Sequence, residues 1–432
     1  MRVLVTNPQA PQAYAIIRAL RPYATSIVAT VEGEGLRARL AHAANSRLVD
    51  ATHRVPSLVE EWSGGRFTHE TTDRERAFVD AVERICGQHQ IDVIFPSWDP
   101  YVFALSKHRE RFDRAGVTVP VPSFDIALTA LDKYRTVRLG EQVGFPCPRT
   151  YLYESRDQLR AISDEEPFPL VVKPRFTSGG RGMVLVQDRA ALEEAVARIA
   201  TRFGSPLIQE YIPGGQRDSV QLVLDRNGEL VFAFHKRRLR TFRRTARFGT
   251  VSESAPPEER VLKTASLVSR VGWWGALGVE TIRDPRDGLD KLMEINPRFP
   301  RQLWNRTELG INEPLMCIGI ARHEPVEAVS AYPQGVLFVS PVEDASLFAL
   351  QVLDRWAYLV RTRILRHGLL DPLTAPLSTW QQAKSFASTY VSRQPKVLDP
   401  YSRYFMSDPV ASTLWWLQFW TWLAGSCREL GR

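Results

Sequence analysis

The sequence predicts an α/β protein that ends in a mostly helical region. Three observations lead to this expectation. Strand and helix patterns alternate from Met1 to about Pro120, short apolar strands joined by glycine-containing turns follow in the middle, and helical patterns dominate the end of the chain. With 432 residues, the chain is long enough for two to four domains of roughly 100–200 residues each.

The first part of the chain alternates strands and helices. Apolar strands are expected at residues 3–5, 27–29 and 93–97, with an apolar-periodic helix over 13–20 between the first two. Such alternation predicts a parallel sheet covered by helices. The first strand–helix turn, residues 6–10, lacks the G-x-G-x-x-G pattern, so dinucleotide binding is not expected there.

Trp98 and Asp99 follow the end of the last of these strands. Ligands bind at the carboxyl ends of strands in α/β folds, so this pair is a candidate contact. An ordinary strand-end loop is the favoured interpretation.

Composition excludes several classes of protein. The apolar and charged fractions are those of a soluble globular protein, and no apolar run approaches the roughly 20 residues that cross a bilayer. The N-terminus enters a strand directly without a signal-peptide pattern, and the four cysteines have no metal-type spacing, so a reducing cytoplasmic setting is expected. The net charge of +8 suits an anionic partner, and only eight of the 56 basic residues are lysine.

A hairpin over residues 278–298 carries the clearest chemical pattern. Asp-Pro and Asp-Gly turn pairs lie between two apolar strands, and pairing centred on Asp287 places Glu280 opposite Glu294. The period of two then adds Asn296 and Arg298 to the same face. Adjacent carboxylates repel unless a cation lies between them, and such oxygen ligands suit Mg²⁺. An exposed hairpin with one charged face is the alternative.

A glycine-rich turn follows the strand that ends at Lys173. Ser178, Gly179, Gly180 and Gly182 separate this strand from a second one. Glycines can bring backbone N–H groups onto phosphate oxygens because no Cβ blocks the approach. No G-K-[ST] pattern follows, so the turn is not a Walker loop, and an ordinary hairpin turn remains the alternative.

Three further segments bear on function. Lys133 lies at the start of a helix, and a strand running into a turn over residues 207–214 can present backbone groups and Glu210 to an adenine edge. The run from Lys236 to Arg247 is the densest basic stretch in the chain. A solvated loop and nucleic-acid contact are alternatives, but we favour a loop over an anionic active site.

Together these segments resemble the ATP-grasp superfamily over about Val119 to Val329, and within it the carbamoyl-phosphate-synthase-like branch of carboxylate–amine ligases. Any one segment would be weak, whereas their order and spacing make the match strong. The first 120 residues likewise resemble the α/β domain that precedes the grasp in this family. The residues that match the family's ATP-binding pattern are Lys133, Lys173, Ser178, Gly179, Gly180, Gly182, Gln209, Glu210, Tyr211, Ile212 and, as a ribose contact, Asp218.

The resemblance implies roles for the remaining site residues. Glu280, Glu294 and Asn296 match the ligands of two magnesium ions, with Mn²⁺ as an alternative. Arg298 corresponds to the arginine that neutralises the transferred phosphoryl group, and Lys236 is a second candidate for that role. The family's Pro- and Gly-rich loop after the basic stretch is absent here, and no biotin-attachment or glutamine-hydrolysing segment is visible, which argues against biotin carboxylation and complete carbamoyl-phosphate synthesis.

The resemblance also implies a domain order. We expect a Rossmann-like pre-ATP-grasp domain over 1–119, a small lid lobe over 120–206, a large lobe with the magnesium site over 207–330 and a helical appendage over 331–432. The appendage contains a basic helical stretch and a nearly all-apolar one, 414–423. Packing on the grasp is the favoured interpretation, and contact with the inner face of a membrane is the alternative.

The expected function is ATP-dependent ligation of a small carboxylate to an amine through an acyl phosphate, with ADP and phosphate as products. Homodimer formation is left open. A non-catalytic ATP-binding module that clamps a partner is the first alternative. A nucleic-acid binder, resting on the basic run, is the second, and no nucleic acid is expected on balance.

Overall fold

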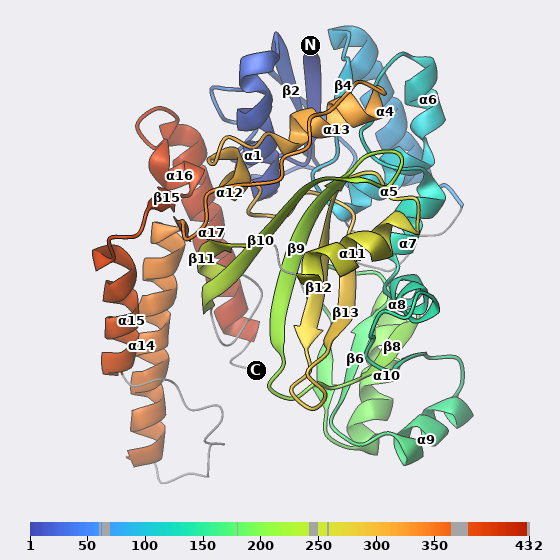
Figure 1. Ribbon diagram of the computed structural model, residues 1–432, viewed down its shortest axis with the longest axis vertical. Helices are drawn as coiled ribbons and strands as arrows, with labels where there is room; N and C mark the ends of the chain where they lie inside the picture. The colour runs from blue at the N-terminus through green and yellow to red at the C-terminus, as the bar shows by residue number, and fades with distance from the viewer. Residues whose placement is uncertain are drawn as a thin grey trace. The chain divides into compact units, whose positions relative to one another are not determined.

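The computed structural model describes residues 1–59, 62, 70–178, 180–241, 249–256, 259–363 and 379–429. The chain forms two compact units. The first contains residues 1–236 and 256–332, and the second contains residues 237–255 and 333–432. Figure 1 traces their elements. No helix in the described ranges combines the length and apolarity that a membrane span requires.

The first unit begins with a parallel sheet in the order β3-β2-β1-β4. This confirms the predicted alternation of strands and helices. The elements are β1 (Arg2–Thr6), α1 (Pro11–Leu20), the 3₁₀ turn η1 (Arg21–Tyr23), β2 (Ser26–Glu32), α2 (Leu36–Arg39), β3 (Ala51–Val55), α4 (Asp73–His89), β4 (Val93–Phe95), α5 (Asp99–Lys107) and α6 (Arg109–Arg114).

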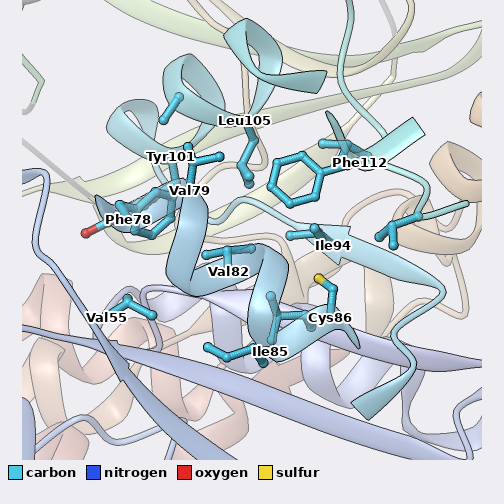
Figure 2. Close-up of a cluster of buried hydrophobic side chains, with 14 of the residues drawn as sticks. Val55, Phe78, Val79, Val82, Ile85, Cys86, Ile94, Tyr101, Leu105 and Phe112 are labelled. Atoms are coloured by element: carbon cyan, nitrogen blue, oxygen red, sulfur yellow. The ribbon is translucent and has the colours of Figure 1, made fainter. Parts of the chain in front are cut away.

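The core of this part lies between α4 and the sheet. Phe78, Val82 and Ile85 recur at helical spacing along α4 and are buried against strand residues such as Ile94 (Figure 2). Thr72 caps the start of α4 by accepting a hydrogen bond from a backbone N–H of the first turn. This packing fixes the carboxyl end of β4, where Trp98 and Asp99 lie.

A small antiparallel lobe follows two connecting helices. Its sheet has the order β5-β8-β6-β7, and helices cover one face with a core that includes Leu170, Val172 and Ile208. The elements are α7 (Phe124–Leu131), α8 (Lys133–Gln142), β5 (Thr150–Leu152), α9 (Arg156–Glu165), β6 (Leu170–Pro174), β7 (Val184–Val186), α10 (Arg189–Phe203) and β8 (Pro206–Glu210). Because side chains alternate along a strand, Lys173 lies on the face of β6 away from that core.

The second lobe of the first unit has the antiparallel strand order β13-β12-β9-β10. One face of this sheet is apolar, with Val220, Leu277 and Leu292 buried against residues of α7, α8 and α11. The elements are β9 (Gln216–Leu224), β10 (Leu230–Thr241), α11 (Glu259–Ser269), β12 (Gly275–Arg283), β13 (Asp290–Asn296), α12 (Trp304–Thr307) and α13 (Glu313–Ala321). The opposite face carries the polar side chains of the candidate site.

The second unit begins where β10 continues past Lys236. In this unit β11 (Gly249–Ala255) pairs antiparallel with β14 (Leu337–Val339), which pairs parallel with β15 (Lys396–Leu398). The helices are α14 (Pro341–Arg363), α15 (Thr379–Val391), α16 (Pro400–Arg403) and α17 (Pro409–Glu429). The expected helical region is confirmed, although β14 and β15 were not predicted. The bounds of the four predicted domains stay predictions.

The apolar helix at the end of the chain is one-sided. On α17, Trp415 and Phe419 are buried, whereas Leu417 and Trp420 are 48% and 49% exposed. The spacing of four residues between Trp415 and Phe419 places them on one face of the helix. This apolar stretch therefore buries one face and exposes apolar side chains on another, and membrane contact, the alternative named for it, stays a prediction.

A buried carboxyl group in the second unit makes stability depend on pH. Burial, with a smaller effect of Glu343, raises the pKa of Asp399 to about 7. Between about pH 4 and pH 7 the folded state then binds more protons than the unfolded state, so the free energy of unfolding falls as the pH rises. Asp399 accepts hydrogen bonds from the backbone N–H groups of Tyr401 and Ser402, which an asparagine oxygen can also do.

We expect Asp399→Asn to be more stable than the wild type at pH 8 by about 1–4 kcal/mol, and by a clearly smaller margin at pH 5. Urea unfolding at the two pH values measures this difference. An equal difference at both values would show that the carboxyl group is not the cause.

Candidate active site

The hairpin of β12 and β13 brings the predicted carboxylates together. Glu280 pairs directly with Glu294, and Gly278 pairs with Asn296, as the turn chemistry predicted. The register shifts just beyond this pair, because Glu280 faces Glu294 whereas Thr281 faces Leu292. Met293 is the extra residue of this β-bulge. The bulge sends Leu292 into the apolar core while Glu294 points to the opposite face, which simple alternation does not allow.

Arg298 lies next to these residues. Its guanidinium donates to Asn296 Oδ1 at 3.2 Å and, through Nε, to Asp99 Oδ1 at 2.6 Å. Burial acts to lower the pKa of Arg298, but Asp99, Glu294 and Glu280 outweigh it, so the pKa is raised. The guanidinium is therefore a permanent, fixed positive charge beside the carboxylate pair.

Two predicted lysines lie near these residues, one at the start of α8 and one on β6 of the small lobe. Lys133, in the first turn of α8, has its Nζ 3.9 Å from Glu294 Oε2 and also donates to the carbonyl of Thr177. Lys173 is buried and donates to Gln209 Oε1 at 2.9 Å. Burial, followed by repulsion from Lys133, lowers the pKa of Lys173 to about 7. Glu294 opposes this lowering of the pKa and Arg217 contributes to it, and no pattern in the sequence had pointed to Arg217.

The glycine-rich turn joins β6 to β7. Gly180 and Gly182 have φ values of +67° and +75°, which side chains rarely adopt. A Cβ on Gly182 would lie 2.7 Å from Pro174 and 2.8 Å from Phe203, so this position excludes a side chain. Ser178 lies within hydrogen-bond reach of Trp98, and Gly179 falls outside the described residues.

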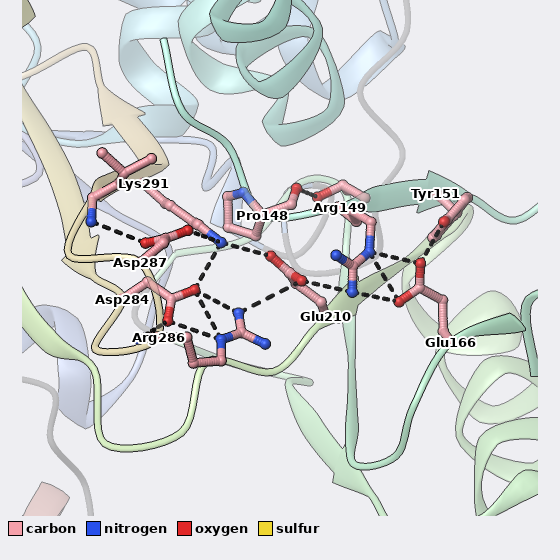
Figure 3. A network of polar contacts seen from close by, with 11 residues as sticks. Pro148, Arg149, Tyr151, Glu166, Glu210, Asp284, Arg286, Asp287 and Lys291 are labelled. Atoms are coloured by element: carbon pink, nitrogen blue, oxygen red, sulfur yellow. Dashed lines mark hydrogen bonds and ion pairs between the residues drawn. The ribbon is translucent and has the colours of Figure 1, made fainter.

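The adenine segment is only partly placed as predicted. Gln209 shares the Lys173 face of the small sheet, but Glu210 pairs with Leu170 and lies on the other face, toward α9. Its carboxylate is in an ion-pair network (Figure 3), 2.9 Å from Arg149 and 3.3 Å from Lys291. The expectation that the Glu210 side chain reaches adenine is therefore not supported, because the strand alternation turns it away.

The neighbours of Glu210 explain how this segment is held. Tyr211 and Ile212, which follow it, are 36% exposed and buried, respectively. The hairpin tip contributes to the network through Asp284, whose carboxylate lies 2.7 Å from Nζ of Lys291. The guanidinium of Arg286 holds the pKa of Asp284 well below its usual range. The network thus ties the end of β8 to the tip of the β12–β13 hairpin.

Asp218 and Lys236 lie on opposite faces of the larger sheet. Asp218 pairs with Thr281, so it shares the core face, and its Oδ2 is 2.9 Å from Nε2 of His235. This placement does not support the predicted ribose contact. Lys236 lies on the face of Glu280 and donates to Gln302 Oε1.

The basic run begins as a strand and not as the expected loop. Residues 236–241 belong to β10, because their backbone groups are paired. Arg237 lies 2.7 Å from Glu253, and Arg240 is paired with Asp344, so both cations are neutralised by protein carboxylates within the second unit. Residues 242–247 lie outside the described residues.

The residues present fit a divalent metal. Glu280 and Glu294 supply two adjacent carboxylates, and Asn296 supplies an amide oxygen on the same face. Gln221 extends this row across Gly278, and among the described residues its buried Oε1 has no hydrogen-bond partner. The described ranges contain no cluster of three or more His, Cys, Asp or Glu side chains suited to a metal, so a site here would use amide oxygens and substrate phosphates as well.

Comparison with known proteins agrees with this geometry. Residues 130–301 match the sequence profile of the ATP-grasp domain. The chain therefore contains an ATP-grasp domain. This confirms the resemblance inferred from the sequence, and the matched residues include the candidate site from Lys133 to Arg298.

Curated relatives include much larger proteins. A pyruvate carboxylase of Aspergillus terreus is 26% identical over 51% of this chain and 19% of its own length. The large chain of carbamoyl phosphate synthase from Vibrio cholerae is 25% identical over 51% of this chain and 22% of its own length. The chain therefore matches about a fifth of the length of these relatives, so their whole activities do not transfer to it.

Solved structures confirm the predicted fold class. One similar structure is the biotin carboxylase domain of 2-oxoglutarate carboxylase from Hydrogenobacter thermophilus, in complex with MgADP and bicarbonate. The match covers 78% of this chain and 73% of that chain, with 16% identity and a TM-score of 0.61. An L-amino acid ligase from Bacillus licheniformis covers 76% of this chain and 75% of its own, with 18% identity and a TM-score of 0.54. Identities this low establish the fold of the ATP-grasp domain and leave its substrates open.

Proposed function

We propose that this protein is an ATP-dependent ligase that joins a carboxylate to an amine, releasing ADP and phosphate. One observation carries the proposal. The pair Glu280–Glu294 and Asn296 share one sheet face, the fixed charge of Arg298 lies next to Asn296, and Lys133 at the start of α8 lies beside Glu294. A module that only binds ATP has less need of so complete a set of charges around the phosphates.

The reaction would proceed in two transfers. A carboxylate oxygen of the substrate attacks the γ-phosphorus of ATP, and ADP leaves, which gives an acyl phosphate. The amine nitrogen then attacks the carbonyl carbon, the C–O bond to phosphate breaks, and the nitrogen loses a proton. Transfers of this kind depend on positioning and on neutralising charge more than on proton transfer from the protein.

Each charged residue has a defined task in this scheme. Lys133 and Lys173 hold the phosphates of ATP, and Arg298 faces the transferred phosphoryl group and the acyl oxygen, with Lys236 as a second cation on the same face. Glu280, Glu294 and Asn296 would hold Mg²⁺. When bound, Mg²⁺ supplies charge neutralisation to the phosphate oxygens.

The similarity to an L-amino acid ligase and to the carbamoyl phosphate synthase large chain supports C–N bond formation as the reaction class. The biotin carboxylase domain shares the fold at a slightly higher TM-score, which bears on the fold and not on the acceptor. We favour an amine acceptor on the basis of the two ligase relatives.

Formation of ADP from ATP in the presence of paired substrates tests the proposal. We expect ADP release with Mg²⁺ to require both a carboxylate and an amine when panels of amino acids and small carboxylates are screened in pairs. A productive pair should also yield a product whose mass equals the sum of both substrates minus water. ADP release that ignores both substrates, or tight ATP binding without turnover under all pairs, would contradict the ligase and favour an ATP-binding module.

A further inference from the structure

The segment that follows β4 contacts two parts of the candidate site, Arg298 and the glycine-rich turn. Asp99 is 4% exposed and accepts the Nε–H of Arg298 at 2.6 Å, across 199 positions of sequence. Trp98, its neighbour, donates its indole N–H to Ser178 in the glycine-rich turn at 3.2 Å. The guanidinium of Arg181, from the same turn, lies 5.7 Å from the centre of the Trp98 ring.

Asp99 determines where the Arg298 charge lies. Without Asp99, the guanidinium would keep only two longer hydrogen bonds, to Asn296 Oδ1 at 3.2 Å and to the carbonyl of Phe299 at 3.5 Å, and arginine has a large rotamer entropy. The buried carboxylate adds a short, charge-assisted hydrogen bond at Nε that restricts the guanidinium to one orientation. Asp99 thus acts through Arg298 and does not itself need to touch a substrate.

A second set of contacts brings the glycine-rich turn to the N-terminal part of the first unit. Phe176, which precedes the turn, packs with Trp62, Phe103 and Leu131. Arg175 donates to both carboxylate oxygens of Asp132, with its Nε at 2.8 Å. The glycine-rich turn and the residue before it therefore contact the N-terminal part in three ways: by apolar packing of Phe176, by the hydrogen bond from Trp98 to Ser178, and by the cation–π contact of Arg181 with Trp98.

We propose that Trp98 and Asp99 form a single positioning element, in which Asp99 orients Arg298 for the reaction and Trp98 holds the glycine-rich turn over the same site. Trp98 and Asp99 are adjacent in sequence, so the backbone between them couples the position of the glycine-rich turn to the position of the Arg298 guanidinium. The rate measurements below rest on the proposed function, whereas the spectroscopic and exchange measurements do not.

The Asp99 half of the proposal predicts a loss of rate without a loss of nucleotide binding. In Asp99→Asn, we expect kcat to fall about 10–100-fold while KM for ATP changes less than about threefold, because the charge acts at the transferred group. Asp99→Glu should recover part of the rate. Asp113→Asn, which removes a carboxylate paired with the exposed side of Arg109, is the matched control and should leave kcat unchanged.

An NMR readout keeps this half testable without turnover. In protein labelled with ¹⁵N-arginine, the Nε–H of Arg298 should give a downfield-shifted signal, assigned by its loss in Arg298→Lys. The same signal should move upfield in Asp99→Asn and stay in place in Asp113→Asn. A wild-type kcat or an unmoved signal in folded Asp99→Asn would overturn the role of Asp99.

Hydrogen exchange tests the Trp98 half. In nucleotide-free protein, deuterium uptake by peptides covering residues 175–183 should be several-fold faster in Trp98→Ala than in the wild type. Trp98→Phe keeps a ring for Arg181 but loses the N–H, so it should be intermediate. If deuterium uptake in Trp98→Ala equals that of the wild type, both for the peptides covering residues 175–183 and for those of the β12–β13 hairpin, the role of Trp98 is overturned. If no substrate pair supports turnover, the proposed function fails while these two physical measurements still decide the positioning element.

Discussion

Glu294→Gln is expected to abolish ATP turnover, with a loss of at least about 10³-fold in kcat. The substitution keeps the shape of the side chain and removes only its charge. Two adjacent carboxylates are favourable only when a cation lies between them, so an amide in place of one removes most of the attraction for Mg²⁺ and the phosphates it neutralises.

The fold should persist in this variant, which separates a chemical loss from unfolding. The Glu294 side chain is 28% exposed, and its contacts with Lys133 at 3.9 Å and with Asn296 at 3.4 Å are weak. Removing one of two like charges also relieves repulsion from Glu280. Thermal unfolding should therefore shift little, and in the absence of Mg²⁺ and ATP the variant should be at least as stable as the wild type.

Asp287→Asn is the matched control because it removes a carboxylate from the same hairpin. Asp287 lies in the turn, 39% exposed, and accepts the backbone N–H of Leu289, which an asparagine oxygen can also do. The steady-state rate of ADP release by Asp287→Asn, measured with a productive substrate pair, should be close to that of the wild type. Turnover near the wild-type rate in Glu294→Gln would remove the metal assignment, and a comparable loss in Asp287→Asn would point to hairpin stability as the cause.

The hairpin shows what the sequence can and cannot predict. Asp-Gly turn chemistry and alternating apolar residues were sufficient to pair Glu280 with Glu294, because a hairpin is a local structure. The bulge at Met293 was not foreseen. Strict alternation would place Leu292 and Glu294 on the same face. Because Leu292 is buried in the apolar core while Glu294 lies on the opposite face, the strand needs one extra residue between them, and this requirement depends on the packing of the whole lobe.

Longer-range geometry explains what the local sequence could not place. Glu210 looked like an adenine contact because it precedes a turn, but its face is set by the pairing of β8 with β6, which the local sequence does not encode. The contact between Asp99 and Arg298 joins two loops from different parts of the fold. Residues carried by one short pattern were thus predictable, whereas side chains that meet across domains needed the fold.

Lys173→Met is expected to weaken ATP binding about 30–100-fold at pH 6.5 and to remove most of its pH dependence. In the unliganded wild type, burial and Lys133 lower the pKa of Lys173 to about 7. Bound phosphates favour the charged amine, so the pKa must rise in the complex. Below pH 7 the amine is already protonated, whereas above pH 7 binding must take up a proton, so Kd for ATP should rise by up to about tenfold per pH unit.

The nucleotide's own titration contributes equally to both proteins, so the ratio of the two Kd values isolates the lysine. That ratio should be largest at pH 6.5 and approach a smaller constant by pH 9. Lys173→Arg is the control for charge, because a guanidinium stays protonated throughout this range and should show no proton uptake. Calorimetry in two buffers of different ionisation enthalpy measures the uptake directly. Equal uptake in the wild type and Lys173→Met at pH 8 would show that Lys173 does not change its protonation state on binding, and would contradict the predicted pH dependence.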